Sequence, residues 1–272
     1  MEYSVKDIIR KRRSVRSYST SPVREEDMKK LEDYISTLKN PLGVPIEYRF
    51  LNAKEHGLNS PVIVGADTYL GAKVPKAPLC EVAFGYDLEK LMLYALSLGI
   101  GTVWIAGTMN RPAFEKAMDV GENELMPAVT PIGYIAEKMS MRESVMRKGV
   151  KADERLDFSE LFFSGDFSHQ LEKSSAGRFA DALEAVRLAP SAVNKQPWRA
   201  VMSGNAVHFY EKHSKGMAER AFDVQLVDIG IALAHFVLAA EEDGISGKVA
   251  IQDPKLQIAE DTEYIISFIA DE

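Results

Sequence analysis

The feature that most constrains the fold of this chain is an internal repeat of two long apolar helices. The segments 84–98 and 226–242 both carry apolar residues at three- and four-residue steps, and a Gly-Ile pair follows each segment closely. A shift of 145 residues superimposes Gly85 on Gly230, Leu88 on Leu233, Gly99 on Gly244 and Ile100 on Ile245. Two unrelated buried helices could match by chance. We predict instead that the chain carries two copies of one α/β unit, packed like a dimer within one polypeptide.

The length, charge and cysteine content are compatible with two such units. The 272 residues are enough for one large domain or two small ones, since domains centre on roughly 100–150 residues. Thirty-three Lys and Arg against 40 Asp and Glu give a net charge of −7, which argues against a general nucleic-acid-binding surface. A single cysteine, Cys80, excludes an internal disulfide and a multi-cysteine zinc site. No apolar stretch has the roughly 20 residues of a membrane span, so we expect a cytoplasmic protein with no nucleic-acid or membrane partner.

Apolar spacing and turn signals divide the chain into elements. We predict helices at 7–13, 25–38, 84–98, 111–118, 179–188 and 226–242. We predict strands at 46–51, 61–64, 128–135, 199–202, 206–210, 248–251 and 264–269, with a hairpin turn at Ser203-Gly204-Asn205. The charged stretch 136–154 carries no predicted element. The polar segment 164–175 is the best candidate for a linker, so the expected halves are 1–163 and 176–272.

Positive charge is concentrated close to the N-terminus. The run Lys11-Arg12-Arg13-Ser14-Val15-Arg16 places four cations and a hydroxyl group within six residues. Guanidinium groups bind phosphate oxygens through paired hydrogen bonds, and a serine hydroxyl adds a further donor. The run is therefore a candidate phosphate site, with a solvated basic surface as the structural alternative.

A second candidate is the loop Ala189-Pro190-Ser191-Ala192-Val193-Asn194-Lys195-Gln196-Pro197-Trp198, between a predicted helix and a predicted strand. Its two prolines fix the backbone, while Ser191, Asn194 and Gln196 offer hydrogen-bond donors and acceptors. Such a loop is suited to recognise the edge of a planar heterocycle. The alternative is a turn whose polar groups satisfy its own backbone.

Two further patterns bear on chemistry. The small residues Ala106 and Gly107, at the end of an apolar segment, allow backbone amides to approach a ligand closely, although a tight turn after a buried strand explains them as well. The five histidines show no metal-ligand spacing, so no metal site is predicted. His235 lies on the apolar face of the last long helix, which is typical of a hydrogen-bonded core histidine.

Taken together, these motifs resemble the nitroreductase family of FMN-dependent oxidoreductases. The family's R-R-S-x-R is matched by residues 12–16, and its A-P-S-x-x-N-x-Q-P-W by residues 189–198. The segment 99–104, Gly-Ile-Gly-Thr-Val-Trp, is similar to the family's G-L-G-T helix end and tryptophan strand. The resemblance implies an α+β fold, a three-layer α-β-α sandwich, internally duplicated as a pseudo-dimer. Within the family, the chain resembles the nitroreductase subfamily with two fused half-domains per chain.

The order of the motifs departs from that of an ordinary member, in which both lie in the same half. Here the basic motif occurs in the first half and the proline-framed loop only in the second. In the family's dimer the flavin lies at the subunit interface, with the basic motif of one subunit and the loop of the other. The resemblance therefore implies one FMN per chain, between the halves, in a protein that acts as a monomer.

The resemblance also implies roles for individual residues. The expected cofactor-binding residues of the first half are Arg12, Arg13, Ser14 and Arg16 at the phosphate, Arg155 as a further phosphate cation, and Ala106 and Gly107 near the flavin ring. Those of the second half are Pro190, Ser191, Ala192 and Asn194, with Gln196 supporting the loop. No side chain is assigned a catalytic role, because the cofactor carries the chemistry.

The implied activity is ping-pong transfer of hydride from NAD(P)H to an electron-poor small molecule such as a nitro compound or quinone. Two alternatives stand beside it. One is a protein of this fold with weakened or lost flavin binding that acts as a binding or regulatory protein. The other is a flavoenzyme of the same fold with specialised chemistry.

Overall fold

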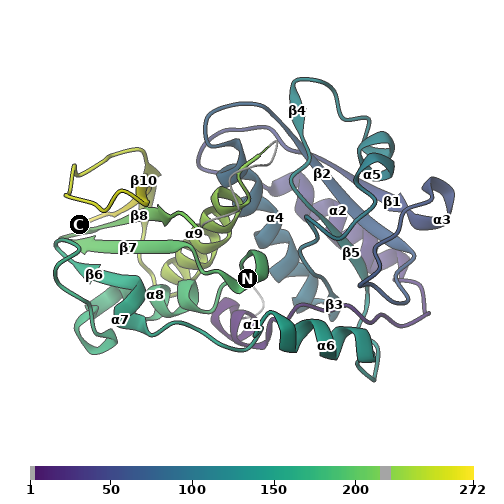
Figure 1. The fold of residues 1–272 in the computed structure, drawn as a ribbon, viewed down its shortest axis with the longest axis horizontal. Helices are drawn as coiled ribbons and strands as arrows, with labels where there is room; N and C mark the ends of the chain where they lie inside the picture. Colours follow the sequence, from purple (N-terminus) through teal and green to yellow (C-terminus); the bar gives the residue numbers. More distant parts are fainter. Residues whose placement is uncertain (1–3, 215–221) are drawn as a thin grey trace.

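The computed structural model describes residues 4–214 and 222–272, and the ribbon has two sheets with helices packed between them (Figure 1). In the first sheet, β1 (Glu47–Asn52), β2 (Thr68–Pro75), β5 (Val129–Tyr134) and β3 (Ile100–Gly101) follow one another in space, and β4 (Glu124–Leu125) pairs with β2. All these pairs are antiparallel. Helices lie on both faces of this sheet, because Leu70 packs toward α4 (Cys80–Ser97) while Tyr69 packs on Phe114 of α5 (Arg111–Met118).

The central strand of this sheet, β2, is absent from the sequence-based prediction. Its interior residues are all buried, so the sequence TYLGAKVP does not alternate between apolar and polar residues. Period-two alternation arises only where one face of a strand meets water. The predicted strand at 61–64 is wrong: the segment is a turn, from which only Val64 forms a bridge, with Ser17.

The second sheet has the order β6 (Phe162–Ser164), β7 (Trp198–Ser203), β8 (Ala206–Lys212), β10 (Thr262–Ala270) and β9 (Gly247–Ala250). The predicted hairpin is confirmed: β7 and β8 are antiparallel neighbours joined through Gly204, whose φ of 59° suits a tight turn. Strand β6 pairs with β7 in parallel, although it precedes most of the expected linker at 164–175. The division into halves 1–163 and 176–272 stays a prediction.

Helices α4 and α9 (Val224–Glu242) lie side by side between the two sheets (Figure 1). They cross where Gly85 faces Gly230, and a Cβ atom on either glycine would overlap a backbone carbonyl oxygen of the other helix. Each helix is followed by a left-handed glycine, Gly99 with φ 78° and Gly244 with φ 75°. The repeated features of the sequence therefore occupy equivalent places in the fold.

The remaining helices complete the two halves. They are α1 (Val5–Lys11), α2 (Glu25–Thr37), α3 (Ala53–His56), α6 (Met141–Gly149), α7 (Phe158–Leu161) and α8 (Ala180–Arg187). Helix α1 belongs to the first half in sequence and packs on α4, but it also packs on α9 and α8 of the second half. The backbone amides of Val5 and Lys6 donate to the carboxylate of Glu242, at 3.1 and 2.9 Å.

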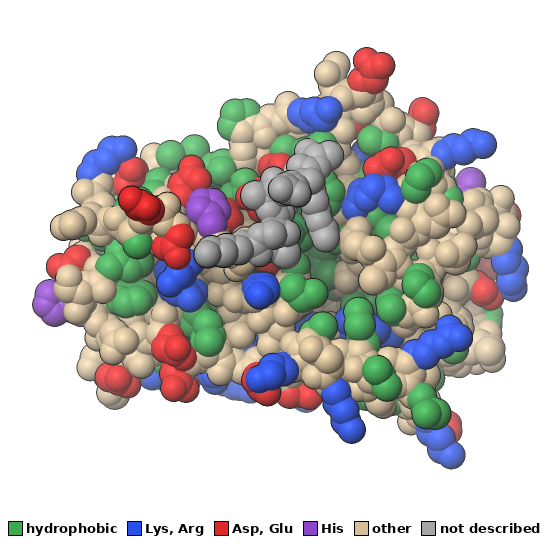
Figure 2. Space-filling model, viewed as in Figure 1, with side chains coloured by type: hydrophobic (Ala, Val, Ile, Leu, Met, Phe, Trp, Pro, Cys, Tyr) green, Lys and Arg blue, Asp and Glu red, His purple; other side chains and the backbone are tan. Residues whose placement is uncertain are grey.

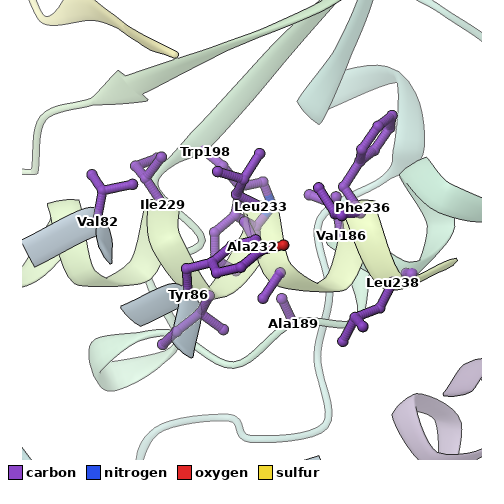
Figure 3. Close-up of a cluster of buried hydrophobic side chains, with 14 of the residues drawn as sticks. Val82, Tyr86, Val186, Ala189, Trp198, Ile229, Ala232, Leu233, Phe236 and Leu238 are labelled. Atoms are coloured by element: carbon purple, nitrogen blue, oxygen red, sulfur yellow. The ribbon is translucent and has the colours of Figure 1, made fainter. Parts of the chain in front are cut away.

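A continuous apolar core joins the halves. Figure 3 shows Trp198, Val186 and Phe236 around α9, with Val82 and Tyr86 of α4 close by. Trp198 and Phe236 are fully buried, and Phe236 meets Phe209 of β8 edge to face at 5.5 Å between ring centroids. Because this core continues across α4 and α9, we expect the two halves to unfold as one unit.

Candidate active site

A cavity of about 230 Å³ lies between the halves, lined by residues from both. The face drawn in Figure 2 is hollowed near its centre. All the sequence-predicted site residues except Arg13 and Gln196 line the cavity: Arg12, Ser14, Arg16, Ala106, Gly107, Arg155, Pro190, Ser191, Ala192 and Asn194. The basic motif and the proline-framed loop, far apart in sequence, thus meet around one space.

Three arginines contribute buried nitrogen atoms that have no hydrogen-bond partner among the residues that the structure describes: Arg12 Nε, Arg16 Nε and Nη1, and Arg155 Nε. Burial is the main cause that lowers the pKa of each guanidinium group, to about 10 for Arg155. Mutual repulsion adds to the effect, since the charge of Arg12 lowers the pKa of both others. An anion in the cavity would supply both the missing acceptors and the missing negative charge.

One buried carboxylate, that of Glu143, contacts both Arg13 and Arg16 but forms an ion pair only with the Arg13 side chain. Glu143 of α6 is fully buried; its Oε1 accepts from Arg13 Nη1 at 2.6 Å, and its Oε2 accepts from the backbone amide of Arg16 at 3.1 Å. Arg13 is thereby paired within the protein and does not line the cavity, in contrast to its expected place in the site. The Arg16 side chain lines the cavity, and its Nε and Nη1 have no hydrogen-bond partner in the described part of the chain.

The proline-framed loop is held in a strained conformation. Val193, Asn194 and Gln196 all have positive φ angles, of 45°, 57° and 50°, which is rare for residues other than glycine and unusual for a β-branched valine. The backbone amide of Ala192 donates to both oxygens of Asp228, at 3.0 and 3.1 Å. The amide of Gln196 donates to Ser191 Oγ at 2.8 Å. The bonds to Asp228 fix the loop against α9, and the bond to Ser191 closes the loop on itself.

Gln196 and Asn194 tie the loop to the segment that precedes α7. The Gln196 side chain does not line the cavity; its Oε1 accepts from the Leu156 backbone amide at 3.0 Å. Asn194 Nδ2 donates to the carbonyl oxygens of Lys151 and Glu154, at 2.8 and 3.0 Å. Asn194 lines the cavity, but its amide nitrogen is used within the protein, which matches the structural alternative considered for this loop. Its carbonyl oxygen lies 3.4 Å from Arg155 Nη1 and helps to orient that guanidinium group.

Asp228 is a cavity residue that sequence reasoning missed. It lies in α9, is 2% exposed, and its carboxylate accepts the Ala192 amide as described above. Burial, with repulsion from Glu211 and Asp223, raises the pKa of Asp228 well above its usual range. The signal available in the sequence was a single carboxylate in an otherwise apolar stretch, Leu226-Val227-Asp228-Ile229.

A buried polar chain connects the cavity wall to the helix crossing. Trp104 lines the cavity, and its indole Nε1 donates to Glu89 Oε2 at 2.7 Å. Glu89 Oε1 lies 2.8 Å from His235 Nε2, and His235 Nδ1 lies 2.9 Å from the carbonyl oxygen of Ala185. Glu89 and His235 are both fully buried, so the expectation of a hydrogen-bonded core histidine is confirmed. The chain joins α4 of the first half to α9 of the second.

Helix α6 was also missed, although its residues Met146 and nearby Val150 line the cavity. The stretch 136–154 is highly charged and shows no apolar stripe. Its start does carry the S-x-x-E signature of a helix N-terminus, Ser140 to Glu143, and Ser140 Oγ accepts from the Glu143 amide at 3.2 Å. The Glu143 side chain departs from a capping box because it turns to Arg13 and Arg16.

Two sheets with helices between them, and an arginine-rich cavity between the halves, define this chain as a nitroreductase-type α+β protein with two halves. The chain belongs to the nitroreductase family described as "Putative TM nitroreductase", whose model matches residues 4–240. The structure of a "putative nitroreductase" from Thermotoga maritima is similar over 99% of this chain and 94% of that chain, with 19% identity and a TM-score of 0.64. This likeness confirms the expected fold.

Other solved structures match about half of this chain. They include "Nitroreductase with Bound FMN" from Bacteroides fragilis, with 18% identity, 51% of this chain, 92% of that chain and a TM-score of 0.41. They also include "FMN-dependent Nitroreductase" from Clostridium difficile R20291, with 18% identity, 49% of this chain, 88% of that chain and a TM-score of 0.42. No curated protein matches the chain.

Helix α9 is long and apolar enough to cross a membrane by length and composition alone. In the fold, 89% of its most apolar 18-residue window is buried inside the protein. A core helix that contacts protein on all sides has the same composition. The apolar character of α9 is therefore explained by its place between the two sheets.

Proposed function

We propose that this protein is an FMN-dependent oxidoreductase that uses NAD(P)H to reduce electron-poor small molecules, such as nitro compounds or quinones. The observation that carries the proposal is the set of buried guanidinium nitrogens without partners at Arg12, Arg16 and Arg155, all on one cavity. Keeping such donors unsatisfied costs stability, so a protein retains them where a ligand needs them.

The chemistry of the donor set suits the phosphate end of FMN. Guanidinium groups form charge-assisted, two-point hydrogen bonds with phosphate oxygens, and Ser14 adds a hydroxyl on the same cavity. The charge balance agrees, because Glu143 is already paired with Arg13, and no carboxylate within residues 4–214 and 222–272 forms an ion pair with Arg12 or Arg16. A phosphate dianion would offset this excess of positive charge.

The rest of the cavity suits an aromatic ring system. Its lining beyond the arginines is mostly apolar and includes Val62, Trp104, Ile105, Val227 and Ile231. Pro190, Ser191 and Ala192 approach from the second half, and the backbone amide of Ala192 is held by Asp228. Ala106 and Gly107 approach from the first half, where the carbonyl oxygen of Ala106 is held by Arg111 Nη2 at 2.8 Å. We assign these residues to the binding and orientation of the isoalloxazine ring.

When bound, FMN supplies a carrier that takes two electrons from NAD(P)H and passes them to the acceptor. The residues of this chain bind and orient it, and the apolar lining limits access of water. A cationic wall at Arg12, Arg16 and Arg155 also stabilises negative charge near the site. The basic motif occurs in one half and the loop in the other, which supports one FMN per chain in a monomer built of halves 1–163 and 176–272.

The test is the identity and amount of small molecule that the purified protein carries. We expect a yellow protein whose acid-released chromophore is FMN, at one molecule per chain, and whose visible absorbance bleaches when NADH or NADPH is added without oxygen. Two flavins per chain would contradict a single site between the halves. A colourless protein that does not take up added FMN would support the alternative of a binding or regulatory protein of this fold.

A further inference from the structure

We propose that Glu211, His213 and Asp223 form a binding site for a divalent transition-metal ion such as Zn²⁺, separate from the cofactor cavity. Each residue offers one ligand atom, and the three atoms lie within 4.8 Å of one another. None of the three residues lines the cavity. The site is independent of the proposed flavin chemistry.

The local fold brings the three side chains together. Glu211 and His213 are two residues apart at the end of β8, and alternate residues of a strand point to the same face. Asp223 is the N-cap of α9, where its carboxylate accepts from the Gln225 amide at 2.8 Å. Capping requires one acceptor position, and a carboxylate offers several, so the same group can also bind a cation. The end of a strand and the start of a long helix thus supply a compact ligand set.

Of the three residues, Glu211 gives the strongest indication that a ligand binds here. Its side chain is 1% exposed, and its Oε1 has no hydrogen-bond partner among the residues described. His213 Nδ1 lies 2.8 Å from this oxygen, so the imidazole and the carboxylate already lie side by side. Neighbouring ligands of a tetrahedral zinc ion with bonds of about 2.0–2.2 Å lie roughly 3.4 Å apart, so the two groups would separate by roughly 0.6 Å on binding.

The charge around Glu211 favours a cation. The carboxylate oxygens of Glu211 and Asp223 lie within 4.8 Å of each other, and Glu263 Oε2 lies 3.6 Å from His213 Nε2, so three carboxylates surround one imidazole. Within residues 4–214 and 222–272, no Lys or Arg forms an ion pair with Glu211 or Asp223. In Figure 2, acidic side chains gather on this face over the second sheet.

The donor set indicates the class of metal. One imidazole nitrogen with two carboxylate oxygens suits an ion of intermediate softness, such as Zn²⁺ or Co²⁺, better than Mg²⁺ or Ca²⁺, which prefer oxygen ligands only. Three protein ligands leave a coordination position for water. A bound ion would link the end of β8 to the start of α9, whose residues Val224 and Val227 line the cofactor cavity. We therefore expect it to stabilise that wall.

The test uses the full-length protein, prepared without a histidine tag and treated with a chelator. We expect one Zn²⁺ ion per chain by calorimetric titration, with proton release, and a visible absorbance band when Co²⁺ is added instead. Glu211→Gln and His213→Ala should each weaken Zn²⁺ binding by roughly 100-fold or more, since loss of even an outer-shell partner costs roughly 10–100-fold. Both variants should keep the far-ultraviolet circular dichroism of the parent.

The matched control is His169→Ala. His169 is exposed and its Nδ1 lies 2.8 Å from a carboxylate oxygen of Asp166, but no third ligand atom joins this pair in the described part of the chain. We expect this variant to bind Zn²⁺ like the parent. Absence of saturable binding, binding unchanged by both Glu211→Gln and His213→Ala, or binding lost in the control would each overturn the proposal. Flavin content, measured in the same samples, reports on the proposed function separately.

Discussion

Gly85 and Gly230 face each other where α4 crosses α9: a Cβ atom on Gly85 would lie 3.2 Å from the Cα atom of Gly230. The two glycines are equivalent in the 145-residue repeat and pack against each other, as equivalent residues do at a two-fold interface. Gly85 also lets α4 approach the carbonyl oxygen of Val227, and Gly230 lets α9 approach the carbonyl oxygen of Val82. The crossing therefore depends on the absence of two methyl groups.

The first prediction concerns this crossing. Gly85→Ala should lower the free energy of unfolding by about 1–3 kcal/mol or more, the usual cost of forcing extra volume into a packed core. Backbone atoms are the obstacle, so no side chain can rotate away. The matched control is Gly149→Ala at the end of α6, where an added Cβ atom meets nothing within 4 Å. Urea denaturation should show little loss of stability in the control, and equal losses in both variants would contradict the account.

The second prediction concerns the basic motif. Arg12→Ala and Arg16→Ala should each weaken FMN binding by roughly 10- to 100-fold, because a hydrogen bond to a charged group contributes about 1.5–3 kcal/mol. Arg10→Ala is the control, since Arg10 is exposed and pairs with exposed Asp7 at 3.0 Å. Fluorescence titration of the flavin-free protein with FMN measures all three. If Arg12 and Arg16 bind the phosphate, inorganic phosphate should also compete less well in these variants than in the parent.

The third prediction separates stability from binding at the same residue. Arg16 is 8% exposed and carries buried nitrogens without partners. In the flavin-free protein, Arg16→Met should therefore raise the free energy of unfolding by about 1–3 kcal/mol, the usual cost of an unsatisfied buried group. With FMN present the order of stabilities should reverse, because ligand binding stabilises only the parent. Thermal melts with and without FMN measure both effects. If the variant is less stable than the parent in both conditions, Arg16 has a structural role instead.

The fourth prediction concerns the buried pair of Glu89 and His235. Glu89→Ala should cost about 3–5 kcal/mol, since it leaves the partner groups buried and uncompensated. Adding His235→Ala to Glu89→Ala should then cost less than it does in the parent, so the double-mutant cycle of these alanine variants should give a strong coupling energy. The exposed pair of Lys29 and Asp33, 2.9 Å apart, is the control and should couple by less than about 1 kcal/mol. Denaturant unfolding of the four variants of each cycle provides the measurement.

The fifth prediction concerns pH and Asp228. Burial raises the pKa of this carboxyl in the folded state, so the folded protein keeps a proton that the unfolded chain releases above its ordinary pKa of 3.8. The contribution of Asp228 to stability is therefore fully present at low pH and is lost as pH rises toward the folded-state pKa. Asp228→Asn keeps an acceptor for the Ala192 amide and removes the titration. Its stability relative to the parent should increase from pH 5 to pH 8 in urea unfolding, whereas Asp33→Asn should show no such trend.

The elements that the sequence predicted well are those whose signal is local. The two long helices, their terminal glycines and the β7–β8 hairpin follow from apolar spacing and turn residues within a short window. The motif residues also meet around one cavity, as the resemblance implied. Strand β2 was missed because it is buried on both faces, and α6 was missed because its stabilising partners, Arg13 and the Arg16 backbone, lie far away in sequence.

Other features were decided by pairing between distant segments. In the sequence, nothing distinguishes the three arginines of residues 12–16 from one another. Only the fold pairs Arg13 with Glu143 and places Arg12 and Arg16 on the cavity. Asp228 becomes a support for the loop only because α9 passes beneath Ala192. His213 had no metal-ligand spacing in the sequence, since its neighbours in space come from β8 and from the start of α9.

The amino-acid sequence by itself determined the repeated helix, its glycines and the two motifs, because hydrophobic periodicity, turn formation and positive charge are properties of neighbouring residues. The tertiary structure alone decided which charges are neutralised and which stay free. Burial and ion pairing depend on distance in space, and folding brings together groups separated by more than a hundred residues, as with Arg13 and Glu143.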